Sequence, residues 1–329
     1  MDGNPKPRQR RRFALGCLSV VSAFASDEPF TAHLATEPPA SATGFPEYPN
    51  RQTGGRYGAE PCSDTLNRMR SSILIAIVAA GISAAAAPNA LTKEEKAAGW
   101  KLLFDGKSME NWEAGGDSWV IDDGALKSAP KPKIREDLFT KATFGNFELS
   151  WEWKIEANGN SGLKYRIQDR FFVDERRIKE YKRFEDLANE AARTRTTKRS
   201  EATQEYIVGF EYQMIDNDGH PDARRGPYYQ TGAIYSMIPP SQAVAKAAGE
   251  YNLSKVVVRG NHVEHWLNGI KVAEGNLDDP KTLEKSAARW TAESPIHNAL
   301  AKQPKKNCPI ALQNHGDAAW FRSIKIRKL

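Results

Sequence analysis

Cysteine is scarce in this chain, as are long apolar runs and an excess of charge of either sign. Only three of the 329 residues are cysteine, Cys17, Cys62 and Cys308. The first two fall in a segment that we expect to be removed, which leaves Cys308 alone. An exported domain with one cysteine forms no internal disulfide, so its stability must come from its hydrophobic core.

The net charge is small for a chain of this length. It is +6 for the whole sequence, and the first 87 residues contribute nine Lys/Arg and seven Asp/Glu, so the remaining 242 residues carry +4. These charges form no basic stripe, and we therefore expect no nucleic-acid partner. A remainder of this length is enough for one large domain, which we place at 88–329.

The apolar run at residues 73–82 follows a short basic start at Met69 and Arg70 and precedes small residues at 83–87. This order is typical of a secretory signal peptide, and the run is shorter than the ~20 residues that a transmembrane helix needs. We predict a signal peptide at 69–87, a periplasmic or secreted protein, and no stable membrane span once the signal is removed.

Residues 1–68 precede that signal and have no apolar period. Their Pro, Gly, Ser, Thr and Ala content cannot bury a core, so we interpret them as a disordered leader or a wrongly assigned translation start. A rival signal begins at Arg10-Arg11-Arg12-Phe13 and resembles a twin-arginine export signal. We favour the Met69 start because its three regions have the expected form. Both alternatives predict export.

Apolar residues in the remainder recur with a period of two. Between 147 and 155 the odd positions are Phe, Leu, Trp, Trp and Ile, and the even positions are polar. Such alternation is typical of a strand with one buried face. Further strands are predicted, with turn signals between them, so the fold class is all-β, an antiparallel β-sandwich or jelly roll. These strands are 119–121, 163–168, 206–215, 232–237, 255–259, 262–267, 309–314 and 320–327.

One charged insertion, at about 170–206, interrupts this pattern. From 173 to 192 its apolar residues fall at spacings of three and four, which predicts an amphipathic helix. We favour a solvated cap that packs on the sandwich, and a lid over the site is the alternative. A second polar insertion, 277–307, has helical composition around 280–289.

The chain resembles the 3-keto-disaccharide hydrolase family, also described as 3-keto-glucoside 1,2-lyase and 3-keto-2-hydroxy-glucal hydratase domains. The resemblance covers about residues 97–329 and departs from many relatives in its long charged insertion. It implies a concanavalin A-like β-sandwich with a concave carbohydrate groove, and a glycoside or 3-keto-sugar as substrate. The matching segments are 99–108 with Trp112, 160–162, 209–213, 231–235, 265–269, 312–316 and 321–324.

The resemblance also implies chemistry on glucosides that are already oxidised at C3. The ketone acidifies the C2 hydrogen, a base removes it, the C1 substituent leaves, and water adds to give 3-keto-glucose. Such a site needs a base, a group that stabilises the enolate oxygen, and an acid for the leaving group. A divalent metal cation could polarise the ketone. We expect no nucleotide cofactor.

Glu211 is the first candidate for the functional carboxylate, as base or metal ligand. It shares the polar side of its predicted strand with Gln213, a candidate substrate-binding residue. An ordinary exposed strand face is the alternative. His315 is a candidate acid, base or metal ligand, against a hydrogen-bonded loop histidine. Asp216 is a third metal-ligand candidate, although Asp is also common in turns.

The remaining candidates are an arginine and three residues that could contact a sugar. Arg166 could hold the enolate oxygen, or it could pair with a neighbouring carboxylate. Tyr235 could bind or stack on a sugar, and Asn160 could contact it from a turn. His265 is a further substrate-binding candidate, against a structural histidine in a strand beside Trp266.

Two other functions remain open at this point. A non-catalytic carbohydrate-binding module could use the same sandwich, because a fold does not dictate an activity. An ordinary glycoside hydrolase would need two carboxylates about 5–9.5 Å apart. Glu211 and Asp216 are an odd number of residues apart on one strand, which places them on opposite sides and weighs against that pair.

Overall fold

The structure is a computed structural model that describes residues 87–113, 116–195, 199–302 and 305–329. All of them belong to one compact unit, Val78–Leu329. The expected leader at 1–68 and all but the last residue of the expected signal peptide at 69–87 lie outside the described residues. Among the helices of the described part, none has the length and apolar character needed to cross a membrane.

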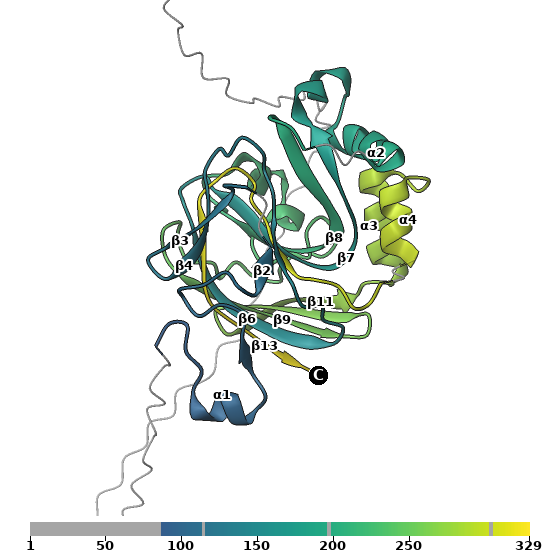
Figure 1. Cartoon of the computed structure of the whole chain (residues 1–329). Helices are drawn as coiled ribbons and strands as arrows, with labels where there is room; N and C mark the ends of the chain where they lie inside the picture. Colours follow the sequence, from purple (N-terminus) through teal and green to yellow (C-terminus); the bar gives the residue numbers. More distant parts are fainter. Residues whose placement is uncertain (1–86, 114–115, 196–198, 303–304) are drawn as a thin grey trace, which may run out of the picture. The chain divides into compact units, whose positions relative to one another are not determined.

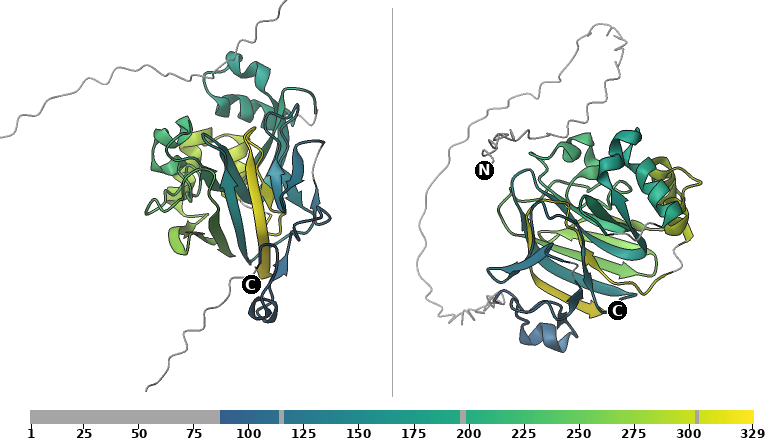
Figure 2. Two further views of the ribbon diagram at one scale, coloured as in Figure 1. Left: turned by 90° about the vertical axis from the view of Figure 1, so that its left-hand side faces the viewer. Right: turned by 45° about the horizontal axis from the view of Figure 1, so that its top comes forward.

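Two antiparallel sheets make up the unit, as Figures 1 and 2 show. The eight-stranded sheet has the order β11-β10-β9-β6-β13-β4-β3, with β1 paired to β13, and the five-stranded sheet has the order β2-β5-β12-β7-β8. The strands are β1 (Lys101–Leu102), β2 (Trp112–Glu113), β3 (Trp119–Asp122), β4 (Ala125–Ser128), β5 (Leu138–Thr140), β6 (Phe147–Ile155), β7 (Asn160–Asp174), β8 (Thr203–Ile215), β9 (Asn252–Arg259), β10 (His262–Leu267), β11 (Ile270–Asn276), β12 (Ala311–Leu312) and β13 (Ala319–Lys328).

The core lies between these sheets and is rich in aromatic side chains. Trp151 and Trp153 of β6 are almost fully buried, and the Trp151 ring contacts Tyr212 of β8 edge-on at 5.1 Å between centroids. The alternating apolar positions of the sequence supply this core because successive residues of a strand point to opposite faces. The predicted β-sandwich is confirmed, and its single described cysteine, Cys308, is free and buried.

At one end of the five-stranded sheet, the segment before β5 pairs with the start of β8, the strand at the far edge. The segment before β5 pairs in parallel with the start of β8 through Arg135 and Gln204, and the Glu205 amide donates to the Arg135 carbonyl at 2.8 Å. A bulge in β7 between Tyr165 and Asp169 bends the β7–β8 hairpin, with Arg166 at a φ of 52°. The start of β8 is thereby brought beside a segment that lies beyond β12 in the strand order.

Helices α2 (Phe184–Thr194), α3 (Pro280–Trp290) and α4 (Pro295–Lys302) contact one another, and α2 and α4 contact the β7–β8 hairpin (Figure 1). The fourth α-helix, α1 (Lys93–Ala97), lies near the start of the described chain. The helix expected at 173–192 is shorter, because β7 continues to Asp174 and a 3-10 helix, Glu175–Glu180, follows it. Since α2 buries Leu187, Ala188 and Ala191, the insertion is a packed cap rather than a loose lid.

The strand predicted at 232–237 is only partly present. Ile234 forms an isolated bridge with Tyr212, which adds a short irregular edge beside β8. Gly232 and Ser236 both have positive φ values, 90° and 61°, so the segment cannot continue as a regular strand. It nevertheless brings Tyr235 beside β8.

Candidate active site

Glu211 lies on the face of the five-stranded sheet that points away from the aromatic core; this face is called the site face below. Its neighbours Phe210 and Tyr212 are buried in the core, so Glu211 points the other way. The side chain is partly buried, and burial raises its pKa, while the charges of Lys164 and Arg289 act in the opposite direction. A carboxylate with a raised pKa is a stronger base than an exposed glutamate.

Lys164 of β7 lies directly opposite Glu211 in the register of the two strands. Its ammonium group forms a 3.0 Å ion pair with Asp137, and the side chains of both residues are almost completely buried. Burial alone would lower the pKa of Lys164, but Asp137 and then Glu211 raise it. The site therefore holds a permanent positive charge beside the candidate base.

Small residues lie beside this pair in the sheet. Ala311 of β12 lies opposite Lys164, and Gly162 lies opposite Gln213. A Cβ atom at Gly162 would come within 2.8 Å of the Glu211 carboxyl carbon, so glycine is required for the carboxylate to lie where it does. The Gln213 amide fits with its nitrogen donating to Glu211 Oε1 and the Ser161 carbonyl, both at 3.2 Å.

We expect Gly162→Ala to displace the Glu211 carboxylate with little effect on the fold. The added methyl group meets a side chain on the site face rather than the core, so the melting temperature should change by a few degrees at most. Activity should fall at least tenfold. Steady-state kinetics and thermal melting check this result. In the control Gly159→Ala, the added methyl group would meet the Glu156 carbonyl in a turn, so the melting temperature should fall while the activity of the folded protein changes little.

Tyr235 completes a row of polar groups across the sheet. Its amide donates to the Glu211 carbonyl at 3.0 Å, which places the two residues opposite each other at the edge of β8. Burial raises the pKa of the Tyr235 hydroxyl well above its ordinary value, so the group stays protonated. A neutral donor thus lies beside the candidate base, in agreement with the predicted substrate-binding role.

His315 borders the same cluster of charges. Burial, followed by the charge of Arg135, lowers its pKa to about 3, and Lys164 and Asp222 also act on it. Its ring lies 6.4 Å from that of His220, edge-on. A neutral imidazole can hydrogen-bond a sugar, but it is a poor general acid at neutral pH. The structure therefore supports a place for His315 at the site and weakens its predicted acid role.

Asp216 serves the turn after β8. Its carboxylate accepts hydrogen bonds from the amides of Asn158 (2.8 Å), Gly219 (3.1 Å) and Asp218 (3.2 Å). Although burial acts in the opposite direction, these bonds lower its pKa. The structure thus supports the turn-forming interpretation. Both carboxylate oxygens of Asp216 already accept hydrogen bonds from the turn, which weakens its candidacy as a metal ligand.

The alternation of the sequence predicts that Arg166 lies with Lys164 on the site face, but in the structure it does not. The bulge in β7 takes it out of register, and its guanidinium donates to the carbonyls of Lys306 and Gly260. Gly260 joins β9 to β10, so Arg166 ties the two sheets together at their rim. The catalytic role predicted for Arg166 is not supported, because the interactions that the structure shows for its guanidinium are structural.

We expect Arg166→Met to reduce stability and to leave the catalytic constants of the folded protein nearly unchanged. Two partly buried hydrogen bonds to the carbonyls of Lys306 and Gly260 would be lost, each worth about 0.5–1.5 kcal/mol or somewhat more because the donor is charged. Chemical denaturation measures the loss, and kcat and KM at a temperature below the transition measure the activity. A large fall in kcat with normal stability would contradict this assignment.

His265 and Asn160 were predicted to bind substrate, and the structure gives them different outcomes. His265 is completely buried between the sheets, with one ring nitrogen 2.9 Å from the Tyr165 hydroxyl and the other 3.0 Å from the Gly232 carbonyl. Burial lowers its pKa to about 3. The substrate-binding prediction for His265 was wrong. Asn160 is also buried, and its backbone amide donates to the Asp317 carboxylate at 3.0 Å. The sugar contact predicted for Asn160 stays a prediction.

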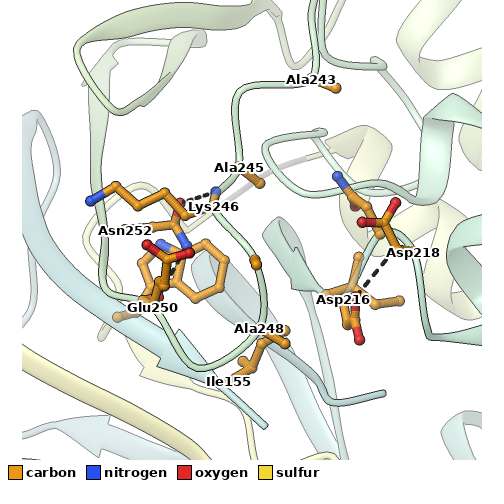
Figure 3. Close-up of a pocket in the computed structure, with 13 residues that line it drawn as sticks. Ile155, Asp216, Asp218, Ala243, Ala245, Lys246, Ala248, Glu250 and Asn252 are labelled. Carbon is orange, nitrogen blue, oxygen red and sulfur yellow. Dashed lines mark hydrogen bonds between the residues drawn. The ribbon is translucent and has the colours of Figure 1, made fainter. Parts of the chain in front are cut away.

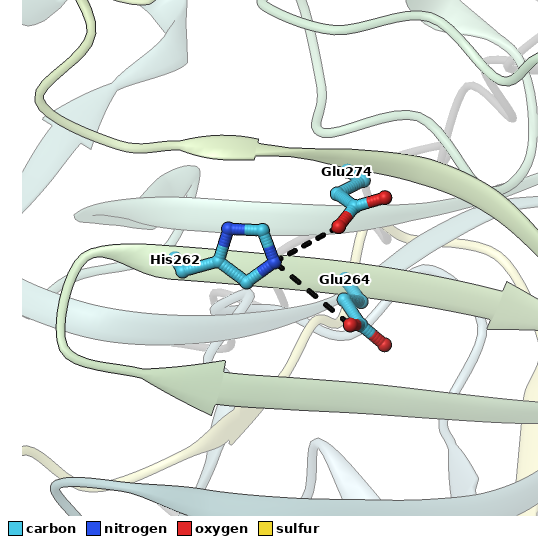
Figure 4. A group of neighbouring side chains, drawn as sticks. All are labelled: His262, Glu264 and Glu274. Carbon is cyan, nitrogen blue, oxygen red and sulfur yellow. Dashed lines mark ion pairs between the residues drawn. The ribbon is translucent and has the colours of Figure 1, made fainter.

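The donor groups of the site do not assemble into a metal centre. Among the described residues, three or more ligand atoms of His, Cys, Asp or Glu come within 4.8 Å of one another only at His262, Glu264 and Glu274. This group lies on β10 and β11 of the other sheet (Figure 4), with His262 Nε2 at 3.1 Å from Glu274 and 3.8 Å from Glu264. Glu274 is already paired with Lys271. The candidates Glu211, Asp216 and His315 are not members of such a group among the described residues, and a metal-ligand role for them stays a prediction.

A cavity of about 260 Å³ lies away from Glu211, between β6, β9, the segment 243–250 and the turn after β8 (Figure 3). Asp216 and Asp218 face it from one side, and Lys246 and Asn252 from the other. Their polar groups are used within the protein: Asp216 holds its turn, and the Lys246 amide donates to Asn252 at 2.8 Å. The cavity does not include Glu211 or Lys164, and we place the chemistry on the site face because these two side chains lie opposite each other there.

Sequence reasoning missed Lys164, Asp137 and Arg289. The alternation of residues 163–167 did place Lys164 on the polar face, which was a usable signal. Asp137 immediately precedes a short strand, β5, that was not predicted, and Arg289 comes from an insertion far along the chain. Nothing in their local patterns indicates that they meet Glu211, whose pKa all three influence.

Most of the domain matches the model of one protein family. The model of the 3-keto-alpha-glucoside-1,2-lyase-like domain matches residues 99–327. The chain belongs to this family. The family assignment predicted from the motifs is thus confirmed, and the match includes every residue of the site face discussed above.

Two relatives agree with the family. The chain is 30% identical over 250 residues to a 3-keto-disaccharide hydrolase from Bacteroides thetaiotaomicron, which covers 70% of this chain and 79% of the relative. A solved structure from Parabacteroides distasonis, named as a candidate glycosyl hydrolase, is 29% identical with a TM-score of 0.55. It covers 74% of this chain and all of that one. The family therefore extends over residues 99–327, which include both sheets of the sandwich except the last residue of β13.

Proposed function

We propose that this chain is an exported carbohydrate-active enzyme that cleaves 3-keto-glycosides. The observation that carries the proposal is the partly buried Glu211 carboxylate opposite the permanently charged Lys164. Membership in the 3-keto-alpha-glucoside-1,2-lyase-like family and the name of the Bacteroides relative support the substrate class. The signal-like segment at 69–87 supports export to the periplasm or beyond.

Glu211 is the proposed base. It removes the C2 hydrogen as a proton, and the electron pair of that bond moves toward the C3 ketone to form an enolate. Lys164, rather than Arg166, donates a hydrogen bond to the enolate oxygen, since its ammonium is fixed beside Glu211 by Asp137. A preorganised donor of this kind stabilises the charge that develops in the transition state.

The C1–oxygen bond then breaks as the double bond between C1 and C2 forms. Tyr235 is the proposed donor to the departing oxygen, because its hydroxyl stays protonated and lies beside Glu211. Water then adds across the double bond: its hydroxide joins C1, its proton returns to Tyr235, and Glu211 returns the abstracted proton to C2, which gives 3-keto-glucose. The net reaction consumes one water and releases one alcohol or sugar. Every step proposed here is carried by side chains of this chain.

The test compares a 3-keto-glucoside with its unoxidised parent, each incubated with the purified protein with and without a chelator. We expect turnover of the keto form alone, because only the ketone acidifies C2, and we expect it to survive the chelator. Cleavage of the parent would support an ordinary glycoside hydrolase and refute the mechanism. Binding of either sugar without turnover would instead support a carbohydrate-binding module.

A further inference from the structure

Arg289 is a partly buried cation that lies near the candidate site. It lies in the last turn of α3, within the second insertion, and its side chain is 19% exposed. The helix is already anchored by Thr282, Ser286 and Trp290, which are buried. Removing a charge from water costs free energy unless other groups compensate, so its neighbours indicate its role.

Apart from the ring of Trp290, which lies 4.3 Å away on the same helix, the neighbours of Arg289 belong to the proposed site and to the other insertion. The guanidinium carbon lies 4.6 Å above the ring of Tyr235, in the geometry of a cation–π contact. One terminal nitrogen donates to the Ser236 hydroxyl at 3.2 Å. Its Nε lies 3.5 Å from a carboxylate oxygen of Glu185 on α2, which is 17% exposed. Arg289 therefore ties both insertions to the edge segment that carries Tyr235.

The charge of Arg289 also acts on the candidate base. Burial acts to lower the pKa of Arg289, but the hydroxyls of Tyr235 and Tyr206 and the carboxylates of Glu185 and Glu211 together raise it above its ordinary value. In return, Arg289 is the second cation, after Lys164, that opposes the effect of burial on Glu211. Two cations from separate parts of the chain thus lie on different sides of one carboxylate.

We propose that Arg289 is a positioning residue of the Glu211 site, which holds Tyr235 against β8 and is itself held by Glu185 of α2. The two helical insertions are then parts of the active site rather than only a cap. This inference rests on the proposed function, because it assigns Glu211 and Tyr235 to the reaction. It gives the helical insertions a role in the site in addition to the apolar residues that they add to the core.

Replacing Arg289 should change the charge of the site without unfolding it. In Arg289→Met, the pKa of Glu211 should rise, so the acidic limb of the kcat/KM profile should move up by about one pH unit. The value of kcat should fall about tenfold as Tyr235 loses its support. In Arg289→Lys, the acidic limb should return close to its wild-type position because the positive charge is retained. The value of kcat should recover less completely.

Lys285→Met is the matched control. Lys285 lies one turn earlier on α3, with its ammonium 4.8 Å above the ring of Tyr228, and no interaction with Glu211 is shown for it. It should leave the profile unchanged. Far-ultraviolet circular dichroism and melting temperatures verify folding of all three variants. An unmoved limb in folded Arg289→Met, or an equal shift in Lys285→Met, would overturn the proposal.

A readout without substrate separates this inference from the proposed function. In protein with ¹³C-labelled glutamate, the Glu211 carboxyl resonance, assigned by its absence in Glu211→Gln, reports its pKa directly. We expect a higher pKa in Arg289→Met than in the wild type. If the wild-type protein fails to turn over keto sugars, the proposed function is refuted, whereas an unchanged Glu211 titration in Arg289→Met refutes the role of Arg289.

Discussion

Replacing Glu211 by Gln should lower kcat on a 3-keto-glucoside by about 10²–10⁴-fold, the usual contribution of a positioned general base. The amide has nearly the shape of the carboxylate and can keep the contact with Gln213, so substrate affinity and the melting temperature should change little. Steady-state kinetics with purified variant and wild type measure the loss. A kcat within threefold of the wild type would exclude Glu211 as the base.

The pH dependence of the wild type follows from the same residue. A base must be deprotonated to act, so activity falls as the pH drops through its pKa. Because burial raises the pKa of Glu211, the acidic limb of kcat/KM should lie above the range of an ordinary glutamate. Glu264→Gln, a partly buried carboxylate on β10 of the other sheet, is the matched control and should leave both kcat and this limb unchanged.

Replacing Lys164 by Met should have the second large effect, a fall in kcat/KM of about 10²–10³-fold, as when a preorganised donor to a developing oxyanion is removed. The variant also leaves Asp137 buried without its partner, which should cost about 3–5 kcal/mol of stability. Kinetics and chemical denaturation together measure both losses. The double variant with Asp137→Asn should recover stability but not activity, because the neutral amide needs no ion pair.

The charge state of Lys164 also distinguishes two mechanisms. Since Asp137 and Glu211 keep it as an ammonium, it should not attack the ketone to form an imine. Borohydride added during turnover should therefore leave the mass of the protein unchanged. A mass increase that maps to Lys164 and disappears in Lys164→Met would show covalent catalysis and replace the electrostatic role proposed for this residue.

The strand that carries Glu211 illustrates how far local pattern can predict this site. Alternation of apolar and polar residues in 208–215 correctly placed Glu211 and Gln213 on one face, because side chains of a strand alternate strictly. The same reasoning failed for Arg166, which lies in the bulge of β7 between Tyr165 and Asp169. A bulge with a left-handed residue shifts the alternation, and the pattern of residue types does not reveal it.

Burial decided the other outcomes. His265 and Asp216 are residue types that commonly serve in active sites, yet their atoms are used by the fold: the histidine lies between the two sheets and the aspartate holds a turn. The residues that influence the pKa of Glu211 come from the segment just before β5, from β7 and from α3, which are separated along the chain by many residues. Their meeting depends on sheet register and on the packing of two insertions.

By itself, the sequence determined the sandwich, the family, and the strand face that carries Glu211, because these follow from periodicity and from motifs that are local in the chain. Only the tertiary structure decided that Lys164 rather than Arg166 lies beside Glu211, and that Arg289 reaches the same site from a distant helix. The physical reason is that charge acts through space: a buried carboxylate responds to whichever cations the fold brings near it, whatever their distance along the chain.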